Sequence, residues 1–184
     1  RGYRVRTAAR RALIAGNAAY DQRAFTKAAA HLGRYLSRHP ADTRTLHKYA
    51  DAQLRRRPPS GSNIQQAVNA LEQILRQNPA EAEAAGKLID LYLLVQDQVS
   101  ARRIAETWYS AVPTEPSARR ALVKTLIAQG KDDDHAKAVE RVREWLTASP
   151  DEPYLLRLEA SVLTAPNQIE QARAVLEGLL DRHP

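Results

Sequence analysis

The segment 79–113, PAEAEAAGKLIDLYLLVQDQVSARRIAETWYSAVP, contains two helical patterns separated by a short polar break. Apolar residues at three- and four-residue spacing share one face of the first expected helix: Leu88, Ile89, Tyr92 and Val95. The second expected helix has large apolar residues, with alanines where two helices must come close: Val99, Ala101, Ile104, Ala105 and Trp108. Pro79 and Pro113 flank the unit 34 residues apart, a period typical of stacked helical hairpins.

This unit resembles a tetratricopeptide (TPR) repeat at several positions where that family has a preferred residue type. Leu88 and Tyr92 fit the packing face of the first helix, Ala101 fits the second helix, and Pro113 fits the end of the motif. Three positions depart from the family pattern: Ala85, Ile89 and Ala105. Repetition strengthens the resemblance, because five such units account for nearly the whole chain: about 5–40, 41–79, 80–113, 114–150 and 151–184.

The resemblance implies an all-α fold, a right-handed α-solenoid of about five stacked antiparallel helical hairpins in a single array over 1–184. No segment has the alternating pattern of a strand. In the first repeat, Gly16 stands at the small-residue position of the first helix. We expect Ser62, Asp151 and Asn167 to begin helices, because each residue type caps helix N-termini well.

The composition is that of a chain that can bury a core, with 43% hydrophobic and 27% charged residues. No apolar run approaches the ~18 residues that a membrane helix needs. Cysteine is absent, which excludes disulfides and thiol catalysis. Because the chain begins with Arg and contains no Met, we expect it to be a segment of a longer protein, and our hypothesis is that this protein is bacterial. A further repeat or a partner would then cover the outer face of the fifth hairpin. The alternative is that this face is polar enough to be exposed to solvent.

Positive charge is concentrated in the N-terminal part of the chain. Residues 1–57 contain 14 Lys and Arg against 3 Asp and Glu, whereas residues 58–184 contain 14 against 18. Three interpretations remain open: a solvated basic face, proximity of residues 1–11 to an anionic membrane, or contact with nucleic acid. Nucleic acid is the least favoured, because the few aromatic residues stand mostly at packing positions.

The chain has no recognisable catalytic motif, and we expect no enzyme activity, cofactor or metal site. A Gly-rich phosphate loop is missing. Three histidines are spaced too widely to share one helix face: His31, His39 and His47. The run DDDH at 132–135 is interpreted as a solvated turn with acids at a helix N-terminus. Glu81 and Glu83 lack a base–nucleophile arrangement.

In the TPR family, the first helices of the repeats line a concave groove that holds an extended peptide or a partner's helix. The resemblance places the following residues of this chain on that surface: Arg10, Asn17, Arg44, His47, Asp51, Arg55, Glu83, Asp90, Arg120, Lys124, Tyr154 and Arg157. The two ends of this surface are basic and its middle is acidic. An acidic segment of a protein or peptide is therefore the expected partner at a basic end.

These observations predict a TPR-type protein–protein interaction scaffold, cytoplasmic and either free or tethered by a membrane helix upstream of this segment. One alternative is a basic helical repeat that contacts RNA or an anionic membrane surface. Another is a regulatory superhelix of an enzyme whose catalytic domain lies outside this segment.

Overall fold

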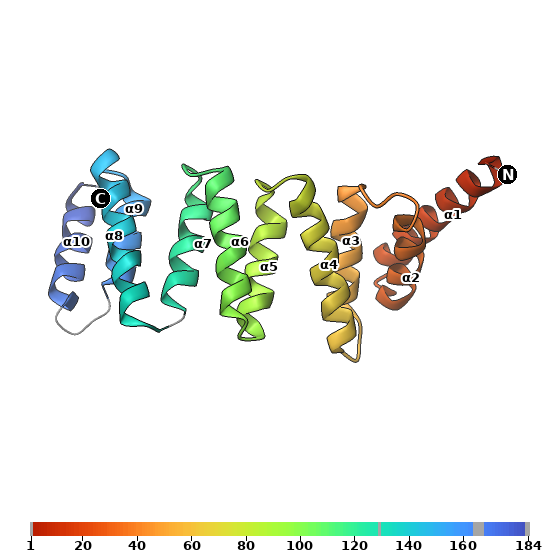
Figure 1. The fold of residues 1–184 in the computed structure, drawn as a ribbon, viewed down its shortest axis with the longest axis horizontal. Coiled ribbons are helices and arrows are strands. Elements are labelled where there is room, and N and C mark those ends of the chain that lie inside the picture. The colour runs from red at the N-terminus through yellow and green to blue at the C-terminus, as the bar shows by residue number, and fades with distance from the viewer. Residues whose placement is uncertain (1, 129, 164–167, 183–184) are drawn as a thin grey trace. The chain divides into compact units, whose positions relative to one another are not determined.

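The computed structural model describes residues 2–128, 130–163 and 168–182, and all regular structure in these residues is helical (Figure 1). The helices are α1 Gly2–Asp21, α2 Phe25–Leu36, α3 Thr43–Arg55, α4 Gly61–Gln77, α5 Ala82–Leu94, α6 Gln98–Ala111, α7 Pro116–Ile127, α8 Asp132–Ala148, α9 Pro153–Val162 and α10 Ile169–Arg182. The described residues form no strand, so the predicted all-α fold of consecutive helix pairs is confirmed. Among these helices, none is both long and apolar enough to cross a membrane.

The chain forms two compact units, Arg1–Leu91 and Tyr92–Pro184, with the boundary inside α5. In unit one, α2 packs against α1 and α3, and α3 also packs against α4. In unit two, each helix from α6 to α10 packs against the next one in sequence. Contacts between sequence neighbours are the pattern expected of stacked hairpins, in which each hairpin covers the apolar face of its neighbour.

Helices α1 and α2 approach each other closely at Gly16 in unit one. Ala28 and Leu32 on α2 are completely buried. A Cβ atom placed on Gly16 would lie 2.6 Å from Leu32 Cδ2 and 3.1 Å from the Leu32 backbone nitrogen. The small residue predicted at position 16 is therefore required by the fold, because any side chain there would overlap α2.

In unit two, the core combines buried alanines and two buried tryptophans, Trp108 and Trp145, with leucines and valines. Ala101 and Ala105 on α6 have no exposed surface, as their positions in the repeat predict. Trp145 on α8 is buried, and its indole nitrogen donates a hydrogen bond to the Tyr109 hydroxyl at 3.0 Å. Arg119 on α7 lies over the Trp145 ring, 5.0 Å from its centroid, which adds a cation–π contact to this aromatic pair.

Two predicted helix starts are wrong by one or two residues. Ser60, not Ser62, caps α4, because its backbone is extended and its side chain accepts a hydrogen bond from the Asn63 backbone nitrogen. At α9 the N-cap residue is Glu152, not Asp151, and Pro153 occupies the first helical position. The third predicted start, Asn167, lies outside the described residues.

The α5–α6 turn also departs from the predicted pattern. Val95 and Val99 are 54% and 76% exposed, although the helical spacing places both on packing faces. Helix α5 ends at Leu94 and Gln96 adopts a positive φ of 61°. The chain reverses there, which turns both valines towards solvent.

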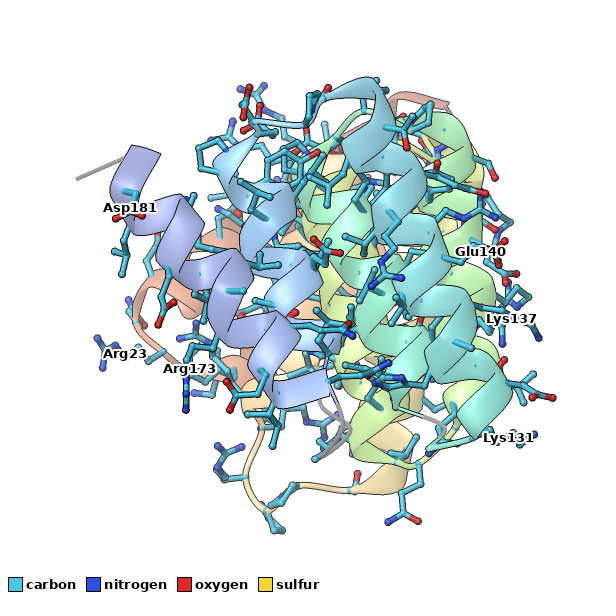
Figure 2. The ribbon with its side chains drawn as sticks, turned by 90° about the vertical axis from the view of Figure 1, so that its left-hand side faces the viewer. Arg23, Lys131, Lys137, Glu140, Arg173 and Asp181 are labelled. Atoms are coloured by element: carbon cyan, nitrogen blue, oxygen red, sulfur yellow. The ribbon has the colours of Figure 1, made fainter. Side chains whose placement is uncertain are left out.

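The sequence pattern predicts that Asp134 lies in a solvated turn, and this prediction is wrong. Its side chain is only 8% exposed and accepts a hydrogen bond from Arg102 Nη1 on α6 at 3.0 Å. Lys137, which projects from the outer face of α8 in Figure 2, adds a weaker ion pair at 3.5 Å. The hydrogen bond from Arg102 lowers the pKa of Asp134, so the pair connects α6 to α8 with Asp134 ionised.

Helix α10 has a mixed outer face. Its labelled charged residues Arg173 and Asp181 point outward in Figure 2. Leu176 and Leu180 are also exposed, the latter by 67%. The polar residues of the fifth hairpin therefore share its surface with apolar side chains.

The Gly16 contact predicts opposite effects for two glycine-to-alanine changes. We expect Gly16→Ala to lower the free energy of unfolding by about 1 to 3 kcal/mol, because its methyl group would overlap Leu32. Gly86→Ala is the matched control in α5, where nothing lies within 4 Å of the added carbon. It should raise stability by up to about 1 kcal/mol through helix propensity. Urea unfolding followed by circular dichroism measures both, and equal effects would contradict the close approach.

The Arg102–Asp134 pair predicts an acid-dependent loss of stability. Asp134→Asn should lower the free energy of unfolding near neutral pH, because it removes the carboxylate through which Arg102 on α6 bonds to α8, and Arg102 keeps only Glu106 on its own helix. The pKa of Asp134 is lowered in the fold, so its contribution is complete above the unfolded pKa. The difference between wild type and variant should shrink as pH falls through the folded pKa. Asp133→Asn, an exposed neighbour, is the control, and a pH-independent difference would contradict the assignment.

Candidate interaction surface of the first helices

The first helices of the repeats are α1, α3, α5, α7 and α9, and polar side chains join neighbouring members. In unit one, the Tyr20 hydroxyl on α1 donates to Asp51 Oδ2 on α3 at 2.6 Å. Lys48 Nζ on α3 donates to Asn17 Oδ1 on α1 at 2.8 Å. Asp51 also pairs with Arg55 at 2.8 Å. We call such hydrogen bonds between side chains of neighbouring first helices, here Tyr20–Asp51 and Lys48–Asn17, the polar rungs.

The Tyr20–Asp51 rung is electrostatically well defined. Burial of the phenol and its hydrogen bond to Asp51 raise the pKa of Tyr20 from 10.0 to about 12. The hydroxyl therefore stays neutral and donates to the carboxylate at every physiological pH. The Lys48 ammonium, which donates to Asn17, also lies 5.6 Å from the centre of the Tyr20 ring, so the two rungs are in contact.

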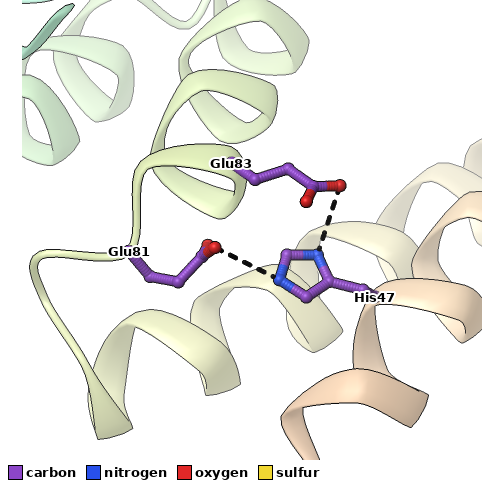
Figure 3. Close-up of side chains that lie close together, drawn as sticks. All are labelled: His47, Glu81 and Glu83. Atoms are coloured by element: carbon purple, nitrogen blue, oxygen red, sulfur yellow. Dashed lines mark ion pairs between the residues drawn. The ribbon is translucent and has the colours of Figure 1, made fainter.

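A further connection joins α3 to the start of α5. The imidazole of His47 lies between two carboxylates, as Figure 3 shows. Its Nε2 is 3.5 Å from Glu81 Oε1, and its Nδ1 is 3.7 Å from Glu83 Oε1. Lys87 donates to Glu83 at 2.6 Å, and this hydrogen bond lowers the pKa of Glu83. The sequence assigned His47 and Glu83 to the groove separately and gave Glu81 no role, whereas the structure brings the three together.

In unit two, the corresponding rung joins α7 to α9. Arg119 Nη1 donates to the Tyr154 hydroxyl at 2.7 Å, and Arg119 Nε donates to the Pro113 carbonyl at 2.7 Å. Arg157 Nε donates to the Pro153 carbonyl one helical turn earlier, at 3.2 Å. Tyr154 is thus held by a residue that the groove prediction did not include.

The predicted groove residues fall into two groups. Asn17, His47, Asp51, Glu83 and Tyr154 take part in cross-helix contacts. The others are exposed on the first helices of their own unit: Arg10, Arg44, Arg55, Asp90, Arg120, Lys124 and Arg157. A single groove over both units stays a prediction. The expected membrane contact through residues 1–11 also stays one, because the side chains of residues 1–6 lie outside those described.

Sequence reasoning missed the partners that hold this surface in place: Tyr20, Lys48, Glu81 and Arg119. One signal could have found two of them. Asn17 and Lys48, like Tyr20 and Asp51, are 31 positions apart, close to one repeat. Polar residues separated by one repeat on neighbouring first helices are natural candidates for such contacts.

A separate basic hollow lies between α1 and α2 in unit one. It measures about 640 Å³ and is lined by alanines and by four basic side chains: Arg11, His31, Arg34 and Arg38. This hollow involves the second helix of the repeat, so it is distinct from the surface that the TPR resemblance implies.

Helix pairs that pack on their sequence neighbours, joined by polar rungs, define a helical-repeat protein of the α-solenoid class. No family model matches the chain, and no curated protein matches it in sequence.

Solved structures of MamA share the fold. One superposes with a TM-score of 0.66 over 95% of this chain and 91% of that chain, at 14% identity. MamA of AMB-1 gives 0.60 over 100% and 95%, at 18% identity. MamA 41-end from Desulfovibrio magneticus RS-1 gives 0.63 over 94% and 93%, at 14% identity. Identities this low establish a shared fold only.

The Tyr20–Asp51 rung predicts an alkaline transition. Because the pKa of Tyr20 rises to about 12 in the fold, its stabilising effect is complete below pH 10.0 and is lost as pH rises towards 12. Tyr20→Phe should cost about 1 kcal/mol at neutral pH and less above that range. Tyr49→Phe, which removes a hydroxyl bonded to the neutral Gln66 amide, is the control. Urea unfolding at several pH values measures the effect, and parallel curves for wild type and Tyr20→Phe would contradict it.

Proposed function

We propose that this chain is a protein-interaction module that binds an extended peptide or a partner's helix over the exposed faces of its first helices. The polar rungs are the observation that supports this proposal most. They hold side chains of neighbouring first helices in defined positions: Asn17 and Asp51 in unit one, and Tyr154 in unit two. A surface ordered before binding loses less side-chain entropy when a partner arrives.

The charge distribution favours an acidic partner segment at unit one. Residues 1–57 hold 14 basic against 3 acidic residues. Arg10 and Arg44 are exposed on α1 and α3, the two first helices joined by the rungs. Exposed guanidinium groups bind carboxylates bidentately, and their positive field speeds the approach of an acidic segment.

The aromatic residues support a protein partner over RNA. Tyr20 packs edge-on against Phe25 at 5.8 Å, and Tyr109 contacts Trp145 at 5.5 Å. Tyr35 stacks on His39 at 4.5 Å. Rings engaged in internal contacts are poor platforms for stacking bases, on which single-stranded nucleic-acid binding depends.

Selection from a random peptide display library, followed by fluorescence polarisation, tests the proposal. We expect enriched peptides to be acidic. The double variant Arg10→Glu/Arg44→Glu should weaken their binding by at least about tenfold, which corresponds to about 1.4 kcal/mol. Arg34→Glu/Arg38→Glu changes the charge equally in the lining of the basic hollow, so it should have a much smaller effect.

Three results would contradict the proposal. One is the absence of any enriched peptide. Another is an equal loss of binding in both double variants, because it would show that only net charge matters. A larger loss in Arg34→Glu/Arg38→Glu would move the binding site to the basic hollow and refute the assignment to the first helices.

A further inference from the structure

The contact between His47 and two glutamates has a geometry of its own. His47 comes from α3, Glu81 immediately precedes α5, and Glu83 lies in the first turn of α5 (Figure 3). One potential ligand atom from each of the three residues lies within 4.8 Å of the other two. All three belong to unit one, so the group joins its second repeat to its third.

The distances are wrong for hydrogen bonds and suitable for a shared cation. His47 Nε2 to Glu81 Oε1 is 3.5 Å and His47 Nδ1 to Glu83 Oε1 is 3.7 Å, both beyond normal hydrogen-bond length. Two ligands of a tetrahedral zinc ion with bonds of 2.0 to 2.1 Å stand about 3.4 Å apart. The first separation is close to this value. Glu83 is 57% exposed, so its side chain can rotate to complete the set.

A second observation concerns the imidazole itself. His47 Nδ1 is shielded from solvent and has no hydrogen-bond partner among the described residues. A buried polar atom without a partner costs free energy, so a native structure usually supplies one. A bound ion engages only one ring nitrogen, so both carboxylates must reach the side of the ring where that nitrogen lies. Glu83, which is 57% exposed, is the one that can rotate to do so.

The surrounding bonds already orient the carboxylates. Glu81 Oε2 accepts from the Ala84 backbone nitrogen at 2.6 Å, which leaves Oε1 facing His47. Lys87 holds Glu83 Oε1 at 2.6 Å. Because this ammonium competes with a cation, Glu83 is the weakest of the three ligands and Glu81 is the best fixed.

We propose that His47, Glu81 and Glu83 bind a divalent transition-metal ion of the zinc type. Imidazole favours Zn²⁺ and similar ions over Mg²⁺ and Ca²⁺, and two carboxylates balance the double positive charge. Three protein ligands leave a coordination position for water or for a carboxylate from outside the chain. His47 and Glu83 also belong to the predicted groove surface, but zinc binding requires no partner, so the site can be tested separately from peptide binding.

Isothermal titration calorimetry of the tag-free chain with ZnCl₂, near neutral pH in a non-chelating buffer, tests this site. We expect saturable one-to-one binding, no comparable heat with MgCl₂, and a zinc-dependent rise in the thermal unfolding midpoint. His47→Ala should abolish binding. Glu81→Gln and Glu83→Gln should each weaken it at least about tenfold. His31→Ala, which removes a histidine outside the cluster, is the matched control.

Two outcomes would overturn the proposal. They are no saturable zinc binding, and equal zinc binding by wild type and His47→Ala. If His47→Ala fails to fold, Glu83→Gln decides the question, because Glu83 is exposed and its loss leaves the core unchanged.

Discussion

The close approach of paired helices is the constraint on which the rest of this structure depends. Gly16 lies against Leu32 with no room for a side chain, and Ala101 and Ala105 are wholly buried. Small residues at these crossings let large neighbours fill the space between helices to the density of a protein core. A single hairpin still leaves one apolar face uncovered, so the next hairpin must pack on it.

Stacking of this kind also places polar residues opposite one another. Tyr20 meets Asp51, Asn17 meets Lys48, and Arg119 meets Tyr154 because each pair lies on neighbouring first helices. These rungs hold the side chains of neighbouring first helices in position. The surface proposed for binding is therefore a consequence of the same packing that stabilises each unit, and so is the arrangement of His47 between two glutamates.

The helices themselves could be predicted from the sequence better than their exact starts and their polar contacts. Helix number, helix order and the buried alanines followed from spacing, since an apolar face must recur with the helical period. Helix starts were less certain, because Ser60 and Ser62 are equally good cap residues and only the local backbone selects one. The environment of Asp134 could not be predicted from its neighbours in sequence, which suggest a solvated turn. Its hydrogen-bond donor, Arg102, lies on another helix.

The sequence by itself determined an all-helical repeat, its pairs of helices and the small residues at their crossings, because these depend on local periodicity. Only the tertiary structure decided which polar side chains meet. The paired residues are 31 positions apart for Tyr20–Asp51, 35 for Arg119–Tyr154 and 36 for Tyr109–Trp145. Turns of different length change this offset from repeat to repeat, so a spacing of about one repeat suggests candidate partners without fixing which residues meet. The contact of His47 with Glu81 and Glu83 depends on how α3 packs near the start of α5, which no single segment of sequence encodes.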